Sequence, residues 1–341
     1  MGQEGLQDFA VAFLSILLEG APFILLGTII SGFIDVYLPA NTLERVLPRN
    51  KFGAILLCGI LGIFLPVCEC AVVPVIRRLV KKGLSVSCAL TYMLAAPIVN
   101  PVTALSTWNA FNGQEPWTMM LSRLGMGYLV AITVGFVILR VPLTAILRNT
   151  FRKSLTAANE KHVDHHHHDG ENCGHDHDHG ESCNHDDHDH GKPCDHHDHN
   201  HSHAQPSGIT QALRSAQRDF VDVGIYFAIG VTITALFNTG IAPGADWIDS
   251  MAESTTGAPA TLMVLAFLLS LCSTSDAFIA ATLDKFGYAA RLAFLVFGPM
   301  MDIKLLFLYS TIFQKRFILY LALALFLLIG ALSITWETLL L

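Results

Sequence analysis

The feature that most constrains this chain is a series of long apolar runs, each close to the length that crosses a lipid bilayer. A helix needs about 20 apolar residues to span roughly 30 Å of hydrocarbon. Eight runs approach that length: Leu6 to Phe33, Phe52 to Ile76, Leu84 to Trp108, Trp117 to Leu139, Phe220 to Phe237, Pro259 to Leu283, Ala290 to Phe313 and Phe317 to Thr338. Since 52% of the residues are hydrophobic and only 14% are charged, the sequence predicts an all-α polytopic membrane protein with about eight transmembrane helices.

Residues 162–203 differ from the rest of the chain in composition and divide it in two. They hold all sixteen histidines, eleven acidic residues and one lysine, whereas the net charge of the whole chain is −7. A segment with almost no apolar side chains cannot build a core, so we expect it to be disordered. The predicted organisation is a first membrane half of four spans (1–141), a cytoplasmic linker (142–218) that contains the loop 162–203, and a second membrane half of four spans (219–341).

Within this loop, a unit of one cysteine followed by histidines and aspartates occurs three times. Imidazole and thiolate are ligands that zinc and copper prefer, and a flexible chain can wrap around such ions. We therefore expect the loop to bind several transition-metal ions; an inert low-complexity linker is the alternative that stays open. The candidate ligands are His165, His166, His167, His168, Cys173, His175, His177, His179, Cys183, His185, His188, His190, Cys194, His196, His197, His199, His201 and His203.

The distribution of basic residues predicts an orientation, because cytoplasmic loops collect lysine and arginine. If the chain starts in the cytoplasm and crosses eight times, fourteen basic residues fall inside and five outside. This favours a cytoplasmic N-terminus and a cytoplasmic His-rich loop in a cell (inner) membrane, although the basic stretch from Arg45 to Lys51 runs against it. The acidic start of the first run does not resemble a cleavable signal peptide. A nucleotide-binding P-loop is also absent, so active transport would draw on an ion gradient.

The two halves resemble each other at a nearly constant offset, which indicates an internal duplication. Glu19 with Gly27 corresponds to Asp222 with Gly230 at an offset of 203 residues. Cys68 with Gly83 and Pro97 with Asn100 correspond in the same way to Cys272 with Gly287 and Pro299 with Asp302, at offsets of 204 and 202. With four spans in each copy the repeats should be parallel, unless a broken segment fails to cross.

The strongest candidate site is the segment Pro66-Val-Cys68-Glu69-Cys70, which lies with Pro74 inside an apolar run. Two cysteines at positions i and i+2 of a regular helix point roughly 200° apart and cannot share an ion. Prolines on both sides remove backbone donors, so the segment can unwind and direct both sulfurs and the carboxylate to one cavity. An intramembrane carboxylate needs a partner or a function. For Cys58 and Cys88, simple packing is the preferred interpretation.

Further candidates extend this transport site into the second half of the chain. Cys272 matches Cys68 by repeat, and Asp276 supplies an acid four residues later. Asn100 and Asp302 each follow a proline whose neighbouring carbonyls could help to complete an ion site.

Two carboxylates one span earlier in each half are candidates for coupling transport to a proton gradient. They are Glu19 and Asp222. A structural ion pair with Arg123 or Lys304 is the alternative for each of them.

The motif Pro66-Val-Cys-Glu-Cys, followed by Ala96-Pro-Ile-Val-Asn-Pro in two four-span halves, resembles the ArsP-type predicted permease family. Within that family it is similar to the copper/zinc efflux branch with a His-rich central loop. The resemblance implies an inner-membrane exporter whose cysteines bind a soft cation. Because relatives expel trivalent organoarsenicals, the family does not choose the substrate, but the imidazole-rich loop favours metal ions.

The leading hypothesis is therefore secondary active efflux of Zn²⁺ or Cu⁺ through Cys68, Glu69 and Cys70. Organoarsenical efflux and a membrane metal sensor that does not transport are the alternatives. We expect no enzymatic activity, no obligatory cofactor beyond Zn²⁺ or Cu⁺ as substrate and loop ligand, and no nucleic-acid partner. The expected partners are metal ions, membrane lipid and, as an open possibility, further copies of the chain.

Overall fold

The computed structural model describes residues 3–37, 47–48, 50–65, 67–152, 155, 208–240 and 257–340. The His-rich loop 162–203 lies outside the described residues, so its proposed metal ligands stay predictions. Within the described ranges every regular element is a helix. The one β-type contact there is an isolated bridge between Leu147 and Phe313. The expected all-α fold is confirmed.

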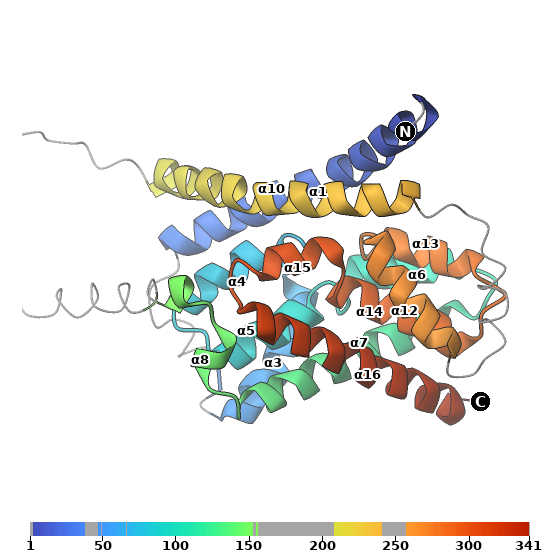
Figure 1. Ribbon diagram of the computed structural model, residues 1–341. Coiled ribbons are helices and arrows are strands. Elements are labelled where there is room, and N and C mark those ends of the chain that lie inside the picture. Colours follow the sequence, from blue (N-terminus) through green and yellow to red (C-terminus); the bar gives the residue numbers. More distant parts are fainter. Residues whose placement is uncertain are drawn as a thin grey trace, which may run out of the picture.

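The same order of helices occurs in the first part of the chain and in the second (Figure 1). The first part contains α1 (Gln3–Tyr37), α3 (Lys51–Phe64), α4 (Val72–Lys81), α5 (Val86–Ala95), α6 (Pro101–Ala110) and α7 (Pro116–Ile138). The second contains α10 (Gly208–Gly240), α12 (Gly257–Leu269), α13 (Ser275–Thr282), α14 (Tyr288–Met300), α15 (Ile303–Tyr309) and α16 (Lys315–Leu340). The short helix α8 (Leu143–Ile146) follows the first set. The domain limits at 141 and 219 remain predictions.

Five described segments are long and apolar enough to cross a membrane: Gln7–Ile34, Pro116–Ile138, Gly208–Leu236, Tyr288–Tyr309 and Lys315–Leu339. Large apolar side chains on these helices face outward, for example Leu18 and Leu319, each 69% exposed. Such a surface is stable against lipid rather than water. The chain is therefore a multi-pass membrane protein, whereas the expected count of eight spans is not confirmed.

The run Phe52 to Ile76, expected to be one span, is a broken hairpin that turns back. Both α3 and α5 run antiparallel to α7, because a side chain at Gly135 of α7 would meet Ile55 and Thr91, and one at Gly127 would meet Ile98. Phe52 also contacts Phe136. Since α3 and α5 run in the same direction and a turn of four residues joins α4 to α5, α4 must return toward the end where α3 began.

The run Pro259 to Leu283 forms the equivalent hairpin in the second half. Helix α14 runs antiparallel to α16, because Gly287 lies near Glu337 and Phe297 contacts Phe326. Helix α12 runs beside α14 in the same direction, because Ala266 lies near Gly298 and Ser270 contacts Ile303. Helix α13 then turns back toward the start of α14. The third run without a long continuous helix, Leu84 to Trp108, is divided between α5 and α6. Broken helices are thus confirmed, but two of them form hairpins instead of spans, and the break between α12 and α13 contains no proline.

The two halves are related by inversion, which corrects the expectation of parallel repeats. The equivalent helices α1 and α10 lie side by side and run antiparallel (Figure 1), because Gly20 meets Phe227, Gly32 meets Ala212 and Gly208 meets Tyr37. Parallel repeats were expected unless a broken segment failed to cross the membrane. Each half contains a hairpin that fails to cross, so an odd number of crossings remains and the second copy enters with the opposite orientation.

This topology also places the start of α1 at one end of the bundle, the far end, and Gly208, the first described residue after the loop, at the other, the loop end. This arrangement differs from the expectation that the N-terminus and the His-rich loop share one side. Helix α1 ends at Tyr37 beside Gly208, where the chain returns from the loop, and α1 therefore begins at the far end. Apart from the buried Arg123 and Lys304, two described basic residues, Lys285 and Arg291, lie toward the far end. Twelve lie toward the loop end: Lys51, Arg77, Arg78, Lys81, Lys82, Arg140, Arg148, Arg152, Arg214, Arg218, Lys315 and Arg316.

Candidate functional site

The break between α3 and α4 carries the two cysteines and the glutamate of the predicted site. Helix α3 ends at Phe64, and the Cys68 carbonyl accepts hydrogen bonds from the Ala71 and Val72 amides as α4 begins. Glu69 is 1% exposed, Cys70 is buried and Cys68 is half-buried. A side chain at Gly27 of α1 would collide with the backbone of Ala71, so a glycine there lets α1 approach the break closely.

Two breaks in the second half lie against this segment. Between α12 and α13, Ser270 adopts a positive φ of 49°, a conformation that costs energy for a residue with a side chain and that often occurs at functional sites. The Ser270 hydroxyl accepts the Ile303 amide at 3.1 Å and so joins this break to the one between α14 and α15. Asp302 caps α15 by accepting the Leu305 amide at 2.7 Å. These contacts hold three breaks together in one buried layer.

A buried lysine, Lys304, connects the two halves through this layer. Its ammonium lies 3.3 Å from Glu69 Oε1 and 3.5 Å from Asp302 Oδ2, and it donates to the carbonyls of Ser270 at 2.8 Å and Leu271 at 3.2 Å. All three ionisable side chains are at most 3% exposed. Glu69 Oε2 and Asp302 Oδ2 have no hydrogen-bond partner in the structure. The site therefore contains two buried carboxylates that one cation compensates.

Lys304 as the partner of Glu69 is the residue that sequence reasoning missed. From the sequence, Lys304 is a candidate partner only for the two carboxylates one span earlier. The residues Glu69 and Lys304 are 235 positions apart, and only the inverted packing brings them together. The signal available in the sequence is the presence of charged residues inside apolar runs, but this signal does not show which charges pair with each other.

The three candidate thiols lie near this ion cluster without forming a ready metal site. Cys68 and Cys70 flank Glu69 in the chain, Cys272 follows Leu271, whose carbonyl accepts from Lys304, and none of these cysteines is in a disulfide. Among the residues that the structure describes, however, no three His, Cys, Asp or Glu side chains converge as a metal would require. Binding of a metal by Cys68, Glu69 and Cys70 thus requires a rearrangement of the break.

The sequence suggested that Asp276 acts together with Cys272. In the structure the Asp276 carboxylate is paired with Arg123 of α7. Arg123 is 1% exposed and donates to both Asp276 oxygens at 2.9 and 2.8 Å, to the Ser273 carbonyl and to the Thr107 hydroxyl. This ion pair ties the hairpin of the second half to a helix of the first. Both oxygens of the Asp276 carboxylate are hydrogen-bonded to Arg123.

Asn100 caps α6, and both ends of its side-chain amide are hydrogen-bonded to the backbone. Its side-chain oxygen accepts the Thr103 amide at 2.8 Å, and its amide donates to the Ala96 carbonyl at 2.8 Å. Because both ends are used in the backbone, Asn100 has the same capping role as Asp302 without the free oxygen.

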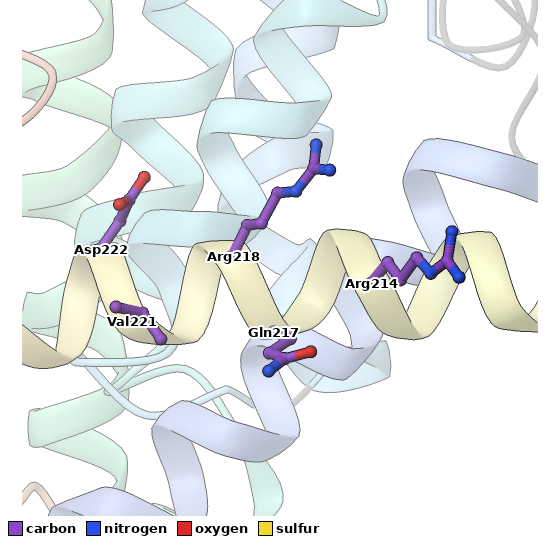
Figure 2. A pocket seen from close by; sticks show the side chains of 5 residues that line it. All are labelled: Arg214, Gln217, Arg218, Val221 and Asp222. Carbon is purple, nitrogen blue, oxygen red and sulfur yellow. The ribbon is translucent and has the colours of Figure 1, made fainter.

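The two coupling candidates lie outside the layer of Glu69. Glu19 accepts a hydrogen bond from the Ser275 hydroxyl at the start of α13. Asp222 is exposed on α10 and lines a pocket of about 450 Å³ together with Arg214, Gln217, Arg218 and Val221. Figure 2 shows Asp222 and Arg218 pointing to the same side of α10. In the described part of the chain, the ion partners of Arg123 and Lys304 are therefore Asp276, Glu69 and Asp302 and not these two carboxylates.

Comparison with known proteins gives matches over nearly the whole chain. The profile of a family described as "Predicted permease", of the ArsP type, matches residues 6–337. The "UPF0718 protein YcgR" of Bacillus subtilis (strain 168) is 33% identical over 307 residues, which cover 90% of this chain and 89% of the relative. A protein of Streptococcus mutans named "Putative two-component membrane permease complex subunit" is 33% identical over 316 residues, covering 92% of this chain and 89% of the relative. No solved structure matches.

Proposed function

Because the chain belongs to the ArsP-type predicted permease family, we propose that it is a secondary transporter that exports a soft transition-metal cation, Zn²⁺ or Cu⁺, through the layer around Glu69. The observation that carries this proposal is a buried carboxylate, 1% exposed and flanked by two cysteines in a broken helix. Thiolate and carboxylate are ligands for Zn²⁺, and thiolate is the preferred ligand of Cu⁺. An intramembrane carboxylate of this kind is typical of a transport site.

The inverted repeat supports a route across the membrane. Transporters built from inverted repeats bind their substrate at broken helices near the repeat interface, and rocking of one half against the other exposes the site to alternate sides. Here the breaks of both halves meet through Glu69, Lys304 and Ser270. In the proposed cycle, a metal ion enters from the loop side, replaces Lys304 at Glu69, binds Cys68 and Cys70, and leaves at the other side after the halves rock.

We propose that the protein lies in a bacterial-type inner membrane and that the loop end of the bundle faces the cytoplasm. Twelve described basic residues toward that end against two toward the other support this orientation by the positive-inside rule. The His-rich loop would then capture cytosolic metal next to the entrance of the transport route. Its imidazoles also favour metal ions over trivalent arsenic as the substrate, because arsenic prefers thiols.

This orientation predicts which parts of the protein a membrane-impermeant reagent can reach. A short epitope added before residue 1 should be labelled in intact cells, whereas one inserted into the loop 162–203 should be labelled only after the membrane is opened. The loop epitope is the matched control for permeability. Equal labelling of both epitopes in intact cells would contradict the opposite placement of the two segments.

The proposed function is tested by metal content in cells that produce variants of the chain. We expect wild type to lower cellular zinc or copper under metal challenge, and Cys68→Ser with Cys70→Ser to abolish this effect, because a serine hydroxyl is a poor ligand for soft metals. The control, Cys58→Ser with Cys88→Ser, changes two buried cysteines outside the break and should export normally. Deletion of residues 162–203 should reduce export only at low metal concentration.

The same experiment separates the alternatives. Protection against methylarsenite without any change in zinc or copper would identify an organoarsenical permease. Normal export by the Cys68→Ser, Cys70→Ser variant would show that these cysteines only fill space.

A further inference from the structure

The first half contains no charges that correspond to those of Asp302 and Lys304, although it contains a backbone break that corresponds to theirs. At the repeat offset of 202 residues, Asn100 corresponds to Asp302 and Val102 to Lys304. Asn100 caps α6 with the same hydrogen bond that Asp302 makes to α15. The fold of this break therefore needs neither charge. A buried lysine that the architecture does not require must be explained by another role.

The contacts of Lys304 show how its ammonium could alternate between two arrangements. It has four oxygen neighbours, of which Glu69 belongs to the first half and Asp302, Ser270 and Leu271 to the second. Losing Glu69 would leave the ammonium with hydrogen bonds to two carbonyls and with the Asp302 carboxylate at 3.5 Å as its counter-charge. Among the described residues, in contrast, Glu69 pairs with no other cation, and its second oxygen has no hydrogen-bond partner. The lysine can thus release Glu69 without becoming unpaired, while Glu69 cannot release the lysine without a replacement cation.

We propose that Lys304 is a built-in counter-cation that takes the place of the metal ion at Glu69 when the carrier returns without substrate. This inference rests on the proposed function. An arriving metal ion displaces the ammonium from Glu69, and the ammonium stays with Asp302. After the metal leaves, the ammonium returns to Glu69, so that no uncompensated carboxylate crosses the apolar layer.

The proposal is tested by comparing two transport modes of purified full-length protein in proteoliposomes. Net uptake of labelled Zn²⁺, or of Cu⁺ under reducing conditions, requires the carrier to return without metal. Exchange of labelled for unlabelled metal across the membrane does not require this return, because the carrier holds a metal ion in both directions. In Lys304→Met we expect net uptake to fall by about tenfold or more, because one partner of a buried charge pair is lost. Exchange should stay close to the wild-type rate, and Lys304→Arg should retain both modes.

A second variant separates this role from simple neutralisation of Asp302. Asp302→Asn with Lys304→Met reproduces the uncharged pattern of the first half, where an asparagine caps the helix, and so protects the fold. Glu69 still lacks its cation in this variant, so net uptake should remain low while exchange continues. Recovery of net uptake, or a parallel loss of both modes in correctly folded protein, would overturn the role of Lys304. If wild type moves neither metal in either mode, the proposed function itself is refuted.

Discussion

Glu69→Gln should abolish metal transport while the protein still folds. Glutamine removes the charge that attracts the cation, and loss of such an interaction lowers metal affinity by at least about tenfold. The fold should persist, because Lys304 keeps Asp302 at 3.5 Å and the Ser270 and Leu271 carbonyls. The measurement is zinc and copper(I) uptake into proteoliposomes, together with size-exclusion behaviour in detergent.

The matched control is Glu115→Gln, which removes an exposed carboxylate at the start of α7, far from the breaks. It should transport like wild type. A membrane metal sensor that does not transport would tolerate neutralisation of Glu69 in a binding or signalling assay. Undiminished uptake by correctly folded Glu69→Gln would therefore remove the basis for the proposed transport site.

The second large effect is expected at the buried pair of Arg123 and Asp276. Arg123→Met leaves the Asp276 carboxylate, 2% exposed, without its cation, and breaking a buried pair typically costs about 3–5 kcal/mol. We expect a markedly lower unfolding temperature and a smaller monodisperse fraction in detergent. The variant should lose transport in proportion to the folded protein that remains.

Replacing both members tests the cause of that loss. Arg123→Met with Asp276→Leu removes the unpaired charge, and apolar replacement of a buried ion pair is often neutral or stabilising. The double variant should recover most of the unfolding temperature. If it were as unstable as Arg123→Met alone, the hydrogen bonds of Arg123 to Thr107 and Ser273 would be the more important contribution.

The two buried ion clusters differ in how their carboxylate oxygens are hydrogen-bonded. Both Asp276 oxygens accept a hydrogen bond from Arg123 Nη2, although Arg123 Nε has no hydrogen-bond partner among the described residues. Around Lys304, one oxygen of Glu69 and one of Asp302 lack a hydrogen-bond partner. A carboxylate with both oxygens hydrogen-bonded offers no unpaired oxygen, whereas one with an unpaired oxygen can accept a further cation.

Much of the fold follows from the sequence, because membranes impose simple local rules. Apolar length and composition predicted the all-α membrane protein, and the prolines and polar residues in the apolar runs predicted where helices break. The repeat pattern also matched Asn100 with Asp302, and both prove to be helix N-caps. These features depend on neighbouring residues and on the solvent that surrounds a helix, so they can be inferred without knowing the packing.

The direction of the broken helices was decided only by tertiary structure. An apolar run of about 20 residues fits a span or a hairpin equally well, since hydropathy measures length and polarity but not direction. The close approach of α3 and α5 along α7 makes α4 turn back, and this change of direction inverts the second half. The same reversal separates the N-terminus from the loop and gathers the basic residues toward the loop end.

The sequence by itself thus determined that Cys68, Glu69 and Cys70 lie in an unwound segment, because the flanking prolines restrict the local backbone. It could not determine which charges meet there. The partner of Glu69 is Lys304, 235 residues away, and the partner of Asp276 is Arg123, 153 residues away. Charge pairing inside a membrane depends on which helices pack together in three dimensions, and that arrangement arises only when the two inverted halves assemble.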